Sequence, residues 1–245
     1  MSNLIHRVSI PRRLILASLA AYWLAPTPLA VAQQVAATIG GRPILIPVPN
    51  GFREVADDPD GFHTKQWNRA HMHAVFAIAD EYEALLQGAA PNLPNFAFAY
   101  TPVHALNQPL SSLEFDSGRK VLRQRFENSI RESNSLGLSY GSGSESQPPT
   151  LILPESDQLR PNRAHVLSII EDKQGCFSFL AISSVQPGIV ESSAPMLLLN
   201  VSAFSVVNER LLVLGVSCIF KSPADVAVLI GRSQGWVQAL YRSNS

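Results

Sequence analysis

Residues 196–220 read MLLLNVSAFSVVNERLLVLGVSCIF. Two apolar runs, Met196 to Val207 and Leu211 to Phe220, flank the polar residues Asn208-Glu209-Arg210. Apolar runs on either side of a short polar segment are typical of paired strands. The sequence therefore predicts an antiparallel β-hairpin here, and the rest of the fold can be built outward from it.

Two further strands are expected before this hairpin. Ala164 to Ile170 and Cys176 to Ser184 are apolar and are joined by the turn-like Asp172-Lys173-Gln174-Gly175. Short connections join neighbouring antiparallel strands, so we expect four successive strands that meander through one sheet.

The two cysteines outside the N-terminal segment, Cys176 and Cys218, both fall in these strands. One interpretation is a disulfide, since an oxidising compartment would permit it. The alternative is two buried free thiols. The expected strand order favours free thiols, because it does not make the two strands neighbours.

A helix is predicted at the C-terminal end. Ser222-Pro223-Ala224-Asp225 supplies an N-cap residue, a proline at the first helical position and an acid at the third. The expected buried face consists of Val226, Ile230, Val237 and Leu240, with Trp236 beside it.

A second helix is predicted in the middle of the chain. Ser111-Ser112-Leu113-Glu114 has the form of a capping box. Apolar residues recur behind it at helical spacing, namely Phe115, Leu122, Phe126 and Ile130. We expect this helix to reach about Glu132, with Gly118 as a weak point.

The N-terminal half adds shorter elements. Gly40-Gly41 lies between Ala37-Thr38-Ile39 and the run Pro43 to Val48, which predicts a tight hairpin. Two strands should follow at 72–79 and 96–103, with a short helix at 80–87 between them.

These elements define the expected fold class. Strands gathered in the second half, with helices at intervals and no regular alternation of strand and helix, indicate an α+β protein. We expect a mainly antiparallel sheet packed against helices in a single domain, residues 33–245. The Ser- and Gly-rich residues 134–149 are expected to form a flexible loop within that domain.

Residues 1–32 have the organisation of a secretory signal peptide. Arg7, Arg12 and Arg13 form a basic start, and the apolar stretch that follows is too short to cross a bilayer. Small residues then place the expected cleavage between Ala32 and Gln33. An uncleaved anchor is the alternative, and Arg12-Arg13 leaves export by the general or the twin-arginine pathway open.

Charge limits the classes of partner. The three signal arginines are among 19 basic residues that balance 19 acidic ones, so the cleaved chain would be slightly acidic. Nucleic acids and anionic membrane surfaces are bound through concentrated positive charge. We therefore expect neither nucleic acid nor an anionic membrane surface as a partner. Because cleavage would remove the short apolar stretch, we also expect no stable membrane span in the cleaved chain.

Gly137-Leu138-Ser139-Tyr140-Gly141 fits the Gly-x-Ser-x-Gly pattern of a hydrolase. That pattern works when a strand leads into the turn and a helix leaves it. The flanking residues here are polar and resemble neither element, and no spacing makes His165 a partner. A serine hydrolase using Ser139 is therefore an alternative function, and a loop serine is the interpretation we favour.

His71-Met72-His73 would place two imidazoles on one face of a strand, a spacing that can hold a divalent metal. Asp80, Glu81 or His63 could complete the ligand set, but a zinc site needs at least three protein ligands. A pair of surface histidines is the interpretation we favour. We expect no cofactor and name no metal site.

The chain resembles a group of uncharacterised exported bacterial proteins. The shared features are Gly40-Gly41, Ile44 to Pro47, the turn Asn50-Gly51-Phe52 and a closing helix with Trp236. More distantly, the chain is similar to the PsbP-like α+β sandwich. That resemblance implies a binding or accessory module rather than an enzyme, although fold does not fix function.

The sequence thus predicts a periplasmic or secreted, non-catalytic module. Its expected partner is an envelope protein or a small ligand bound at one face of the sheet. The alternatives are the serine hydrolase through Ser139 and metal binding through His71 and His73.

Overall fold

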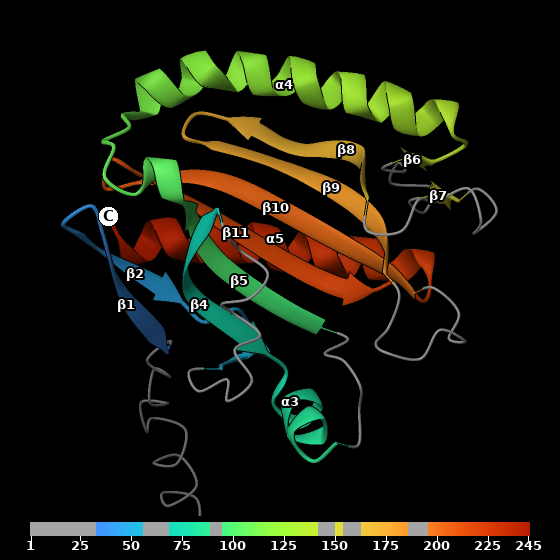
Figure 1. The fold of residues 1–245 in the computed structure, drawn as a ribbon, viewed down its shortest axis with the longest axis horizontal. Helices are drawn as coiled ribbons and strands as arrows, with labels where there is room; N and C mark the ends of the chain where they lie inside the picture. Colours follow the sequence, from blue (N-terminus) through green and yellow to red (C-terminus); the bar gives the residue numbers. More distant parts are fainter. Residues whose placement is uncertain (1–32, 56–68, 89–94, 142–149, 154–162, 186–195) are drawn as a thin grey trace, which may run out of the picture. The chain divides into compact units, whose positions relative to one another are not determined.

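The computed structural model describes residues 33–55, 69–88, 95–141, 150–153, 163–185 and 196–245. The predicted signal segment, including Ala32 of its cleavage site, lies outside the described residues, which begin at Gln33. Residues 33–245 form one compact unit. Its mainly antiparallel sheet, with helices packed against it and a helix at the C-terminal end, confirms the predicted α+β class (Figure 1).

The described elements follow one another as β1 (Gln34–Ile39), β2 (Arg42–Pro47), β3 (Arg53–Glu54), β4 (Ala70–Ala77), α3 (Ala79–Leu86), β5 (Asn95–Pro102), the 3-10 turn η2 (Val103–Ala105), α4 (Ser112–Ser135), β6 (Ser139–Gly141), β7 (Thr150–Ile152), β8 (Ala164–Lys173), β9 (Cys176–Val185), β10 (Met196–Val207), β11 (Arg210–Ile219) and α5 (Pro223–Ser243). Among the described residues, no helix is both long enough and apolar enough to cross a membrane.

The main sheet has seven strands in the order β3-β4-β5-β11-β10-β9-β8, and all of its pairs are antiparallel. The predicted four-strand meander is confirmed, because β8 to β11 are neighbours in chain order. β5 then joins the free edge of β11, so the early strands extend the same sheet. The sequence pattern contained no sign of this non-local pairing.

The turn between β10 and β11 is shorter than predicted. Arg210 belongs to β11 and pairs with Val207, which leaves a two-residue turn of Asn208 and Glu209. Their φ values of 49° and 59° are those of the primed turns that match the twist of a hairpin. The strand register is therefore one residue away from the register that a three-residue connection would give.

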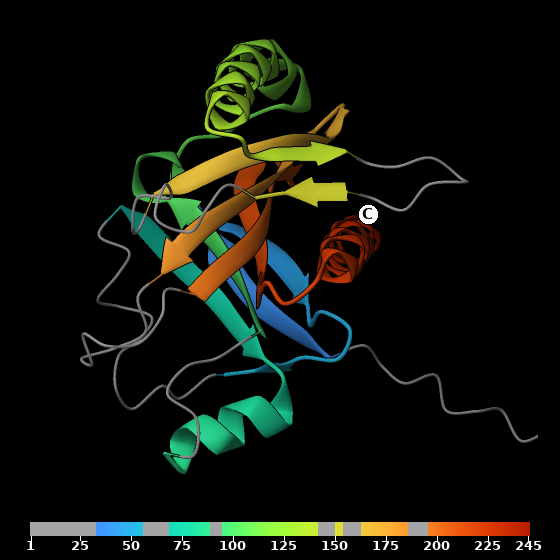
Figure 2. The same ribbon diagram turned by 90° about the vertical axis from the view of Figure 1, so that its right-hand side faces the viewer.

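The two faces of the sheet carry different helices (Figure 2). On one face, α5 packs against β10 and β11 and completes the main hydrophobic core, which includes Leu199, Leu212 and Leu214. On the other face, α4 packs against β8 and forms a smaller cluster with Phe177 and Val206. Successive side chains of a strand point to opposite faces of the sheet, so consecutive residues pack toward different helices.

Helix α5 begins as predicted. The carboxylate of Asp225 accepts hydrogen bonds from the backbone amides of Lys221 and Ser222, at 2.8 and 2.7 Å. The buried face differs from the prediction, because Leu229 and Ser233 are buried and Ile230 is only half-buried.

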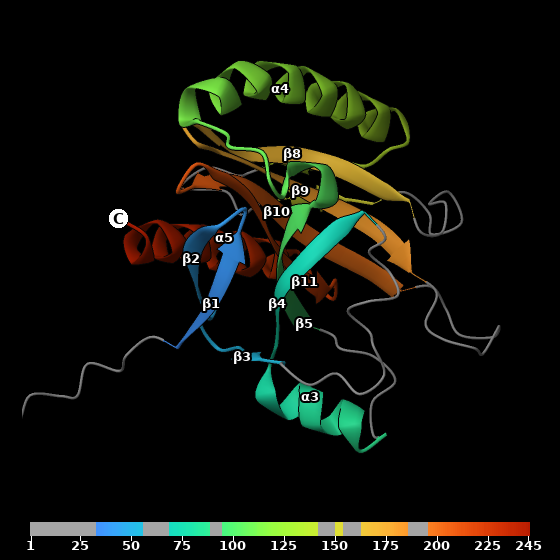
Figure 3. The same ribbon diagram turned by 60° about the vertical axis from the view of Figure 1, so that its left-hand side comes forward.

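The predicted Gly40-Gly41 hairpin is present as β1 and β2, and β2 packs against α5 (Figure 3). Arg210 attaches its tip to the main sheet. The guanidinium donates to the carbonyls of Ile39, Gly40 and Glu209, at 3.2, 2.9 and 2.9 Å. Three carbonyls therefore satisfy a nearly buried arginine without a carboxylate.

Helix α4 has the predicted capping box, in which Ser111 and Glu114 exchange backbone and side-chain hydrogen bonds. It is longer than predicted and continues to Ser135, with no interruption at Gly118. Part of the expected loop 134–149 is therefore regular, since β6 follows and pairs with β7. The rest of that loop, 142–149, lies outside the described residues.

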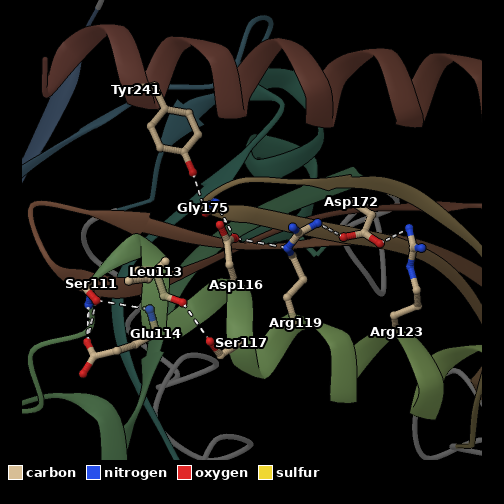
Figure 4. Close-up of polar contacts among 10 residues, drawn as sticks. All are labelled: Ser111, Leu113, Glu114, Asp116, Ser117, Arg119, Arg123, Asp172, Gly175 and Tyr241. Atoms are coloured by element: carbon tan, nitrogen blue, oxygen red, sulfur yellow. Dashed lines mark hydrogen bonds and ion pairs between the residues drawn. The ribbon is translucent and has the colours of Figure 1, made fainter.

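Helix α4 is held to the β8–β9 turn by a charged network (Figure 4). Asp172, whose side chain is only 10% exposed, pairs with both Arg119 and Arg123. Arg119 also pairs with Asp116 at 3.2 Å, and Asp116 accepts a hydrogen bond from the amide of Gly175. This network therefore adds to the hydrophobic contact between α4 and the sheet along the N-terminal half of α4.

We expect Asp172→Asn to loosen this attachment and to lower the free energy of unfolding by about 1.5–3 kcal/mol, the usual range for hydrogen bonds to charged groups. The matched control is Glu127→Gln on the exposed side of α4, which should change the free energy of unfolding by less than about 0.5 kcal/mol. Urea unfolding of the purified proteins measures both. Equal stability of the two variants would show that the Asp172 network does not hold α4.

Candidate binding groove

A cavity of about 370 Å³ lies on the α4 side of the sheet. It extends over β4, β5, β11, β10, β9 and the beginning of β8, and its lining includes no residue of α4. Helix α4 covers the part of this face around Phe177 and Val206. No helix among the described residues contributes to the lining of the cavity. The volume is within the range of small-molecule sites.

Aromatic and aliphatic side chains make most of the groove surface. Phe96, Phe98 and Tyr100 follow one another on β5, with ring centroids 6.0 and 5.9 Å apart. Met72 and Leu198 are half-buried and border the same groove. Apolar surface of this kind gains free energy when a ligand removes it from water.

The Phe98 ring reaches over the strand β11 because its neighbour there is a glycine. Phe98 is paired with Gly215, and a Cβ placed on Gly215 would be 2.2 Å from the Phe98 ring. No side chain fits between this ring and the strand. The pair therefore keeps the ring close to the strand, where it is only 6% exposed and forms part of the apolar lining.

Three of the uncharged polar residues that line the groove are hydrogen-bonded to one another. The Asn200 amide donates to the Ser217 hydroxyl at 2.8 Å, and the Ser202 hydroxyl donates to the Asn200 carbonyl oxygen at 2.6 Å. Asn200 and Ser202 are half-buried, whereas Ser217 is only 1% exposed. We call Asn200, Ser202 and Ser217 the polar trio.

The described lining has no charged side chain. Its one ionisable group is the hydroxyl of Tyr100, and burial raises the pKa of that hydroxyl. Tyr100 is therefore neutral at physiological pH. The groove offers hydrogen bonds and apolar contact to a ligand, but no opposite charge.

The context of Ser139 differs from a hydrolase nucleophile elbow. Helix α4 and a short turn precede Ser139, which is the first residue of strand β6 and pairs with Ile152, so it is not the loop serine that we predicted. The elbow instead needs a strand before the serine and a helix after it. His165 is buried on β8, and its Nε2 has no hydrogen-bond partner among the described residues. Burial, followed by the charge of Arg163, lowers the pKa of His165.

His71 and His73 do come together, with ring centroids 4.9 Å apart. His73 lies at a bulge in β4, and its Nε2 is 2.9 Å from the Thr101 hydroxyl, which itself donates to the Leu211 carbonyl. Nε2 therefore donates to Thr101. Burial, together with the charge of His71, lowers the pKa of His73 to about 4, so this ring is neutral at physiological pH.

No third metal ligand joins these histidines among the described residues, which contain no cluster of three or more His, Cys, Asp or Glu side chains. Glu81 instead accepts hydrogen bonds from the backbone and side-chain amides of Asn95, at 3.1 and 2.7 Å. Asp80 is described but belongs to no such cluster, and His63 lies outside the described residues.

The two cysteines are free and buried, in agreement with the interpretation that the strand order favoured. Cys176 lies opposite Ser205 on β10 and Cys218 lies opposite Leu199. The two positions on β10 are about 20 Å apart at the rise of a strand. A disulfide is therefore excluded. Burial raises the pKa of both thiols to about 11, which leaves them protonated and weakly nucleophilic at neutral pH.

The fold and the groove together define a class of protein: a single α+β domain whose sheet carries helices on both faces and an apolar groove on one of them. Comparison of the chain with protein-family models, curated proteins and solved structures gave no match. The similarity to exported bacterial proteins and to the PsbP-like sandwich remains a prediction from the sequence.

Proposed function

We propose that this protein is an exported, non-catalytic binding module that holds an envelope component or a small ligand in the groove on the α4 side of the sheet. The observation that carries the proposal is the groove itself, with its size, its aromatic lining and the polar trio on its floor. Concave apolar sites with a few placed polar groups are the usual form of ligand sites.

Export is the part of the proposal that rests on the sequence. The basic start, the short apolar stretch and the small residues before Gln33 support it. The mature protein would then meet its ligand in the periplasm or outside the cell.

Native mass spectrometry of protein recovered from the periplasmic fraction of the host tests both parts. We expect a chain that begins at Gln33 and carries a non-covalent adduct of small-molecule mass. The adduct should be lost in Ala164→Trp, because Ala164 is an exposed residue of the groove lining and a large side chain there would fill the mouth.

The matched control is Ala227→Trp, because Ala227 is also an exposed alanine but lies on α5. It should keep the adduct. A full-length chain found only in membranes would contradict cleavage at Gln33 and release of the module, and would indicate the uncleaved anchor instead. An adduct that persists in Ala164→Trp, or no adduct in any preparation, would contradict binding in the groove.

A further inference from the structure

The shape of the groove restricts its occupant. Phe98 lies over Gly215, and Phe96 and Tyr100 continue the row on either side of it at about the same spacing. A flat ring system or an extended hydrocarbon chain can contact such a row along its length. The volume of about 370 Å³ has room for one small molecule and not for a folded partner.

The polar trio restricts the hydrogen bonds that the occupant can make. The Ser202 hydroxyl uses its proton on Asn200, so its lone pairs remain as acceptors on the floor of the groove. Ser202 is half-buried and can be reached from the cavity that it lines. A ligand with a hydroxyl or N–H group can donate to it.

The charge of the lining restricts the occupant further. An ionised ligand group would lose its hydration in the groove and would meet no opposite charge from the described lining residues. Burial of an unpaired charge is unfavourable, so charged ligands are disfavoured relative to neutral ligands of the same shape.

We propose that the groove binds an uncharged, mainly apolar small molecule that donates one hydrogen bond to the polar trio at Ser202. The inference rests on the proposed function, because it specifies the ligand class of the same groove. A charged headgroup does not belong to this class.

A pair of fluorescent probes tests the charge preference. N-phenyl-1-naphthylamine is neutral and has one N–H group, and 8-anilino-1-naphthalenesulfonate has the same ring system with a sulfonate added. We expect the neutral probe to bind the full purified protein at least about tenfold more tightly, since each tenfold step is about 1.4 kcal/mol and an unpaired charge costs more. Fluorescence titration measures both affinities.

Two groove variants locate the bound probe. Ala164→Trp should abolish binding of the neutral probe, whereas Ala227→Trp should not. Ser202→Ala should weaken binding by about twofold to tenfold, the effect of one neutral hydrogen bond. Its matched control is Ser183→Ala, because Ser183 lines the same groove but belongs to none of the trio's hydrogen bonds.

The inference is overturned if the neutral probe does not bind, if both probes bind equally, or if Ala164→Trp and Ala227→Trp bind alike. Equal effects of Ser202→Ala and Ser183→Ala would overturn the role of the trio. Failure of this inference can be distinguished from failure of the proposed function. A natural ligand that mass spectrometry finds in the wild-type protein but not in Ala164→Trp would still establish a binding module.

Discussion

Replacing Trp236 with alanine is expected to lower the free energy of unfolding by about 3–5 kcal/mol, the range for removal of a large aromatic side chain from a core. Trp236 on α5 is only 3% exposed. Its indole N–H donates to the Pro47 carbonyl at 2.6 Å, and its ring is nearly perpendicular to the Phe76 ring, with the two ring centroids 5.5 Å apart. The side chain therefore joins α5 to β2 and to β4, and its loss would open a cavity where three elements meet.

Two further variants separate the contributions to this effect. Trp236→Phe keeps most of the apolar area but leaves the Pro47 carbonyl without its donor, which should cost about 1–3 kcal/mol. Val228→Ala, at a position of α5 that is 52% exposed, is the control and should change stability by less than about 0.5 kcal/mol. Urea unfolding followed by circular dichroism gives all three values. A Trp236→Ala protein as stable as the Val228→Ala control would refute this role of the indole.

Local signals in the sequence were sufficient for most of the elements. The Ser111 to Glu114 capping box and the start of α5 at Pro223 are present, because each depends on residues within one helical turn. The Gly40-Gly41 hairpin is present for the same reason, since a tight turn needs positive φ at these two positions.

The groove could not be predicted from these local signals. It exists because β5 pairs with β11, far away in the sequence, and this pairing places Phe98 over Gly215. Local patterns show that Phe98 belongs to a strand, but they do not show which strand lies beside it. How much of the sheet α4 covers likewise depends on contacts between residues that are distant in the sequence.

The polar trio, in contrast, could have been predicted from the sequence. Counting outward from a two-residue turn places Asn200 opposite Ser217, as observed. The three-residue connection that we predicted would place Asn200 opposite Cys218. A shift of one residue moves every side chain to the other face of the sheet, so the wrong turn length concealed the cluster.

Gly40→Ala is expected to be the second strongly destabilising change. Gly40 has a φ of +53°, and a Cβ there would be 2.6 Å from both the Arg210 Nε and the Leu106 carbonyl oxygen. The left-handed backbone alone should cost about 1–2 kcal/mol with a side chain present. The close contacts should add about 1–3 kcal/mol, the usual cost of overpacking. Arg210 would also be displaced from the carbonyls that hold the hairpin tip to the sheet.

The neighbouring glycine provides the matched control. Gly41 has a φ of +78°, but nothing lies within 4 Å of a Cβ placed there. Gly41→Ala should therefore show only the backbone cost of about 1–2 kcal/mol. Thermal and urea unfolding of the two variants measure the difference, which we attribute to the contact with Arg210 and Leu106. If the two substitutions are equally destabilising, the hairpin tip is not packed against Arg210 as the structure shows, and the attachment of β1 and β2 to the sheet must depend on α5 instead.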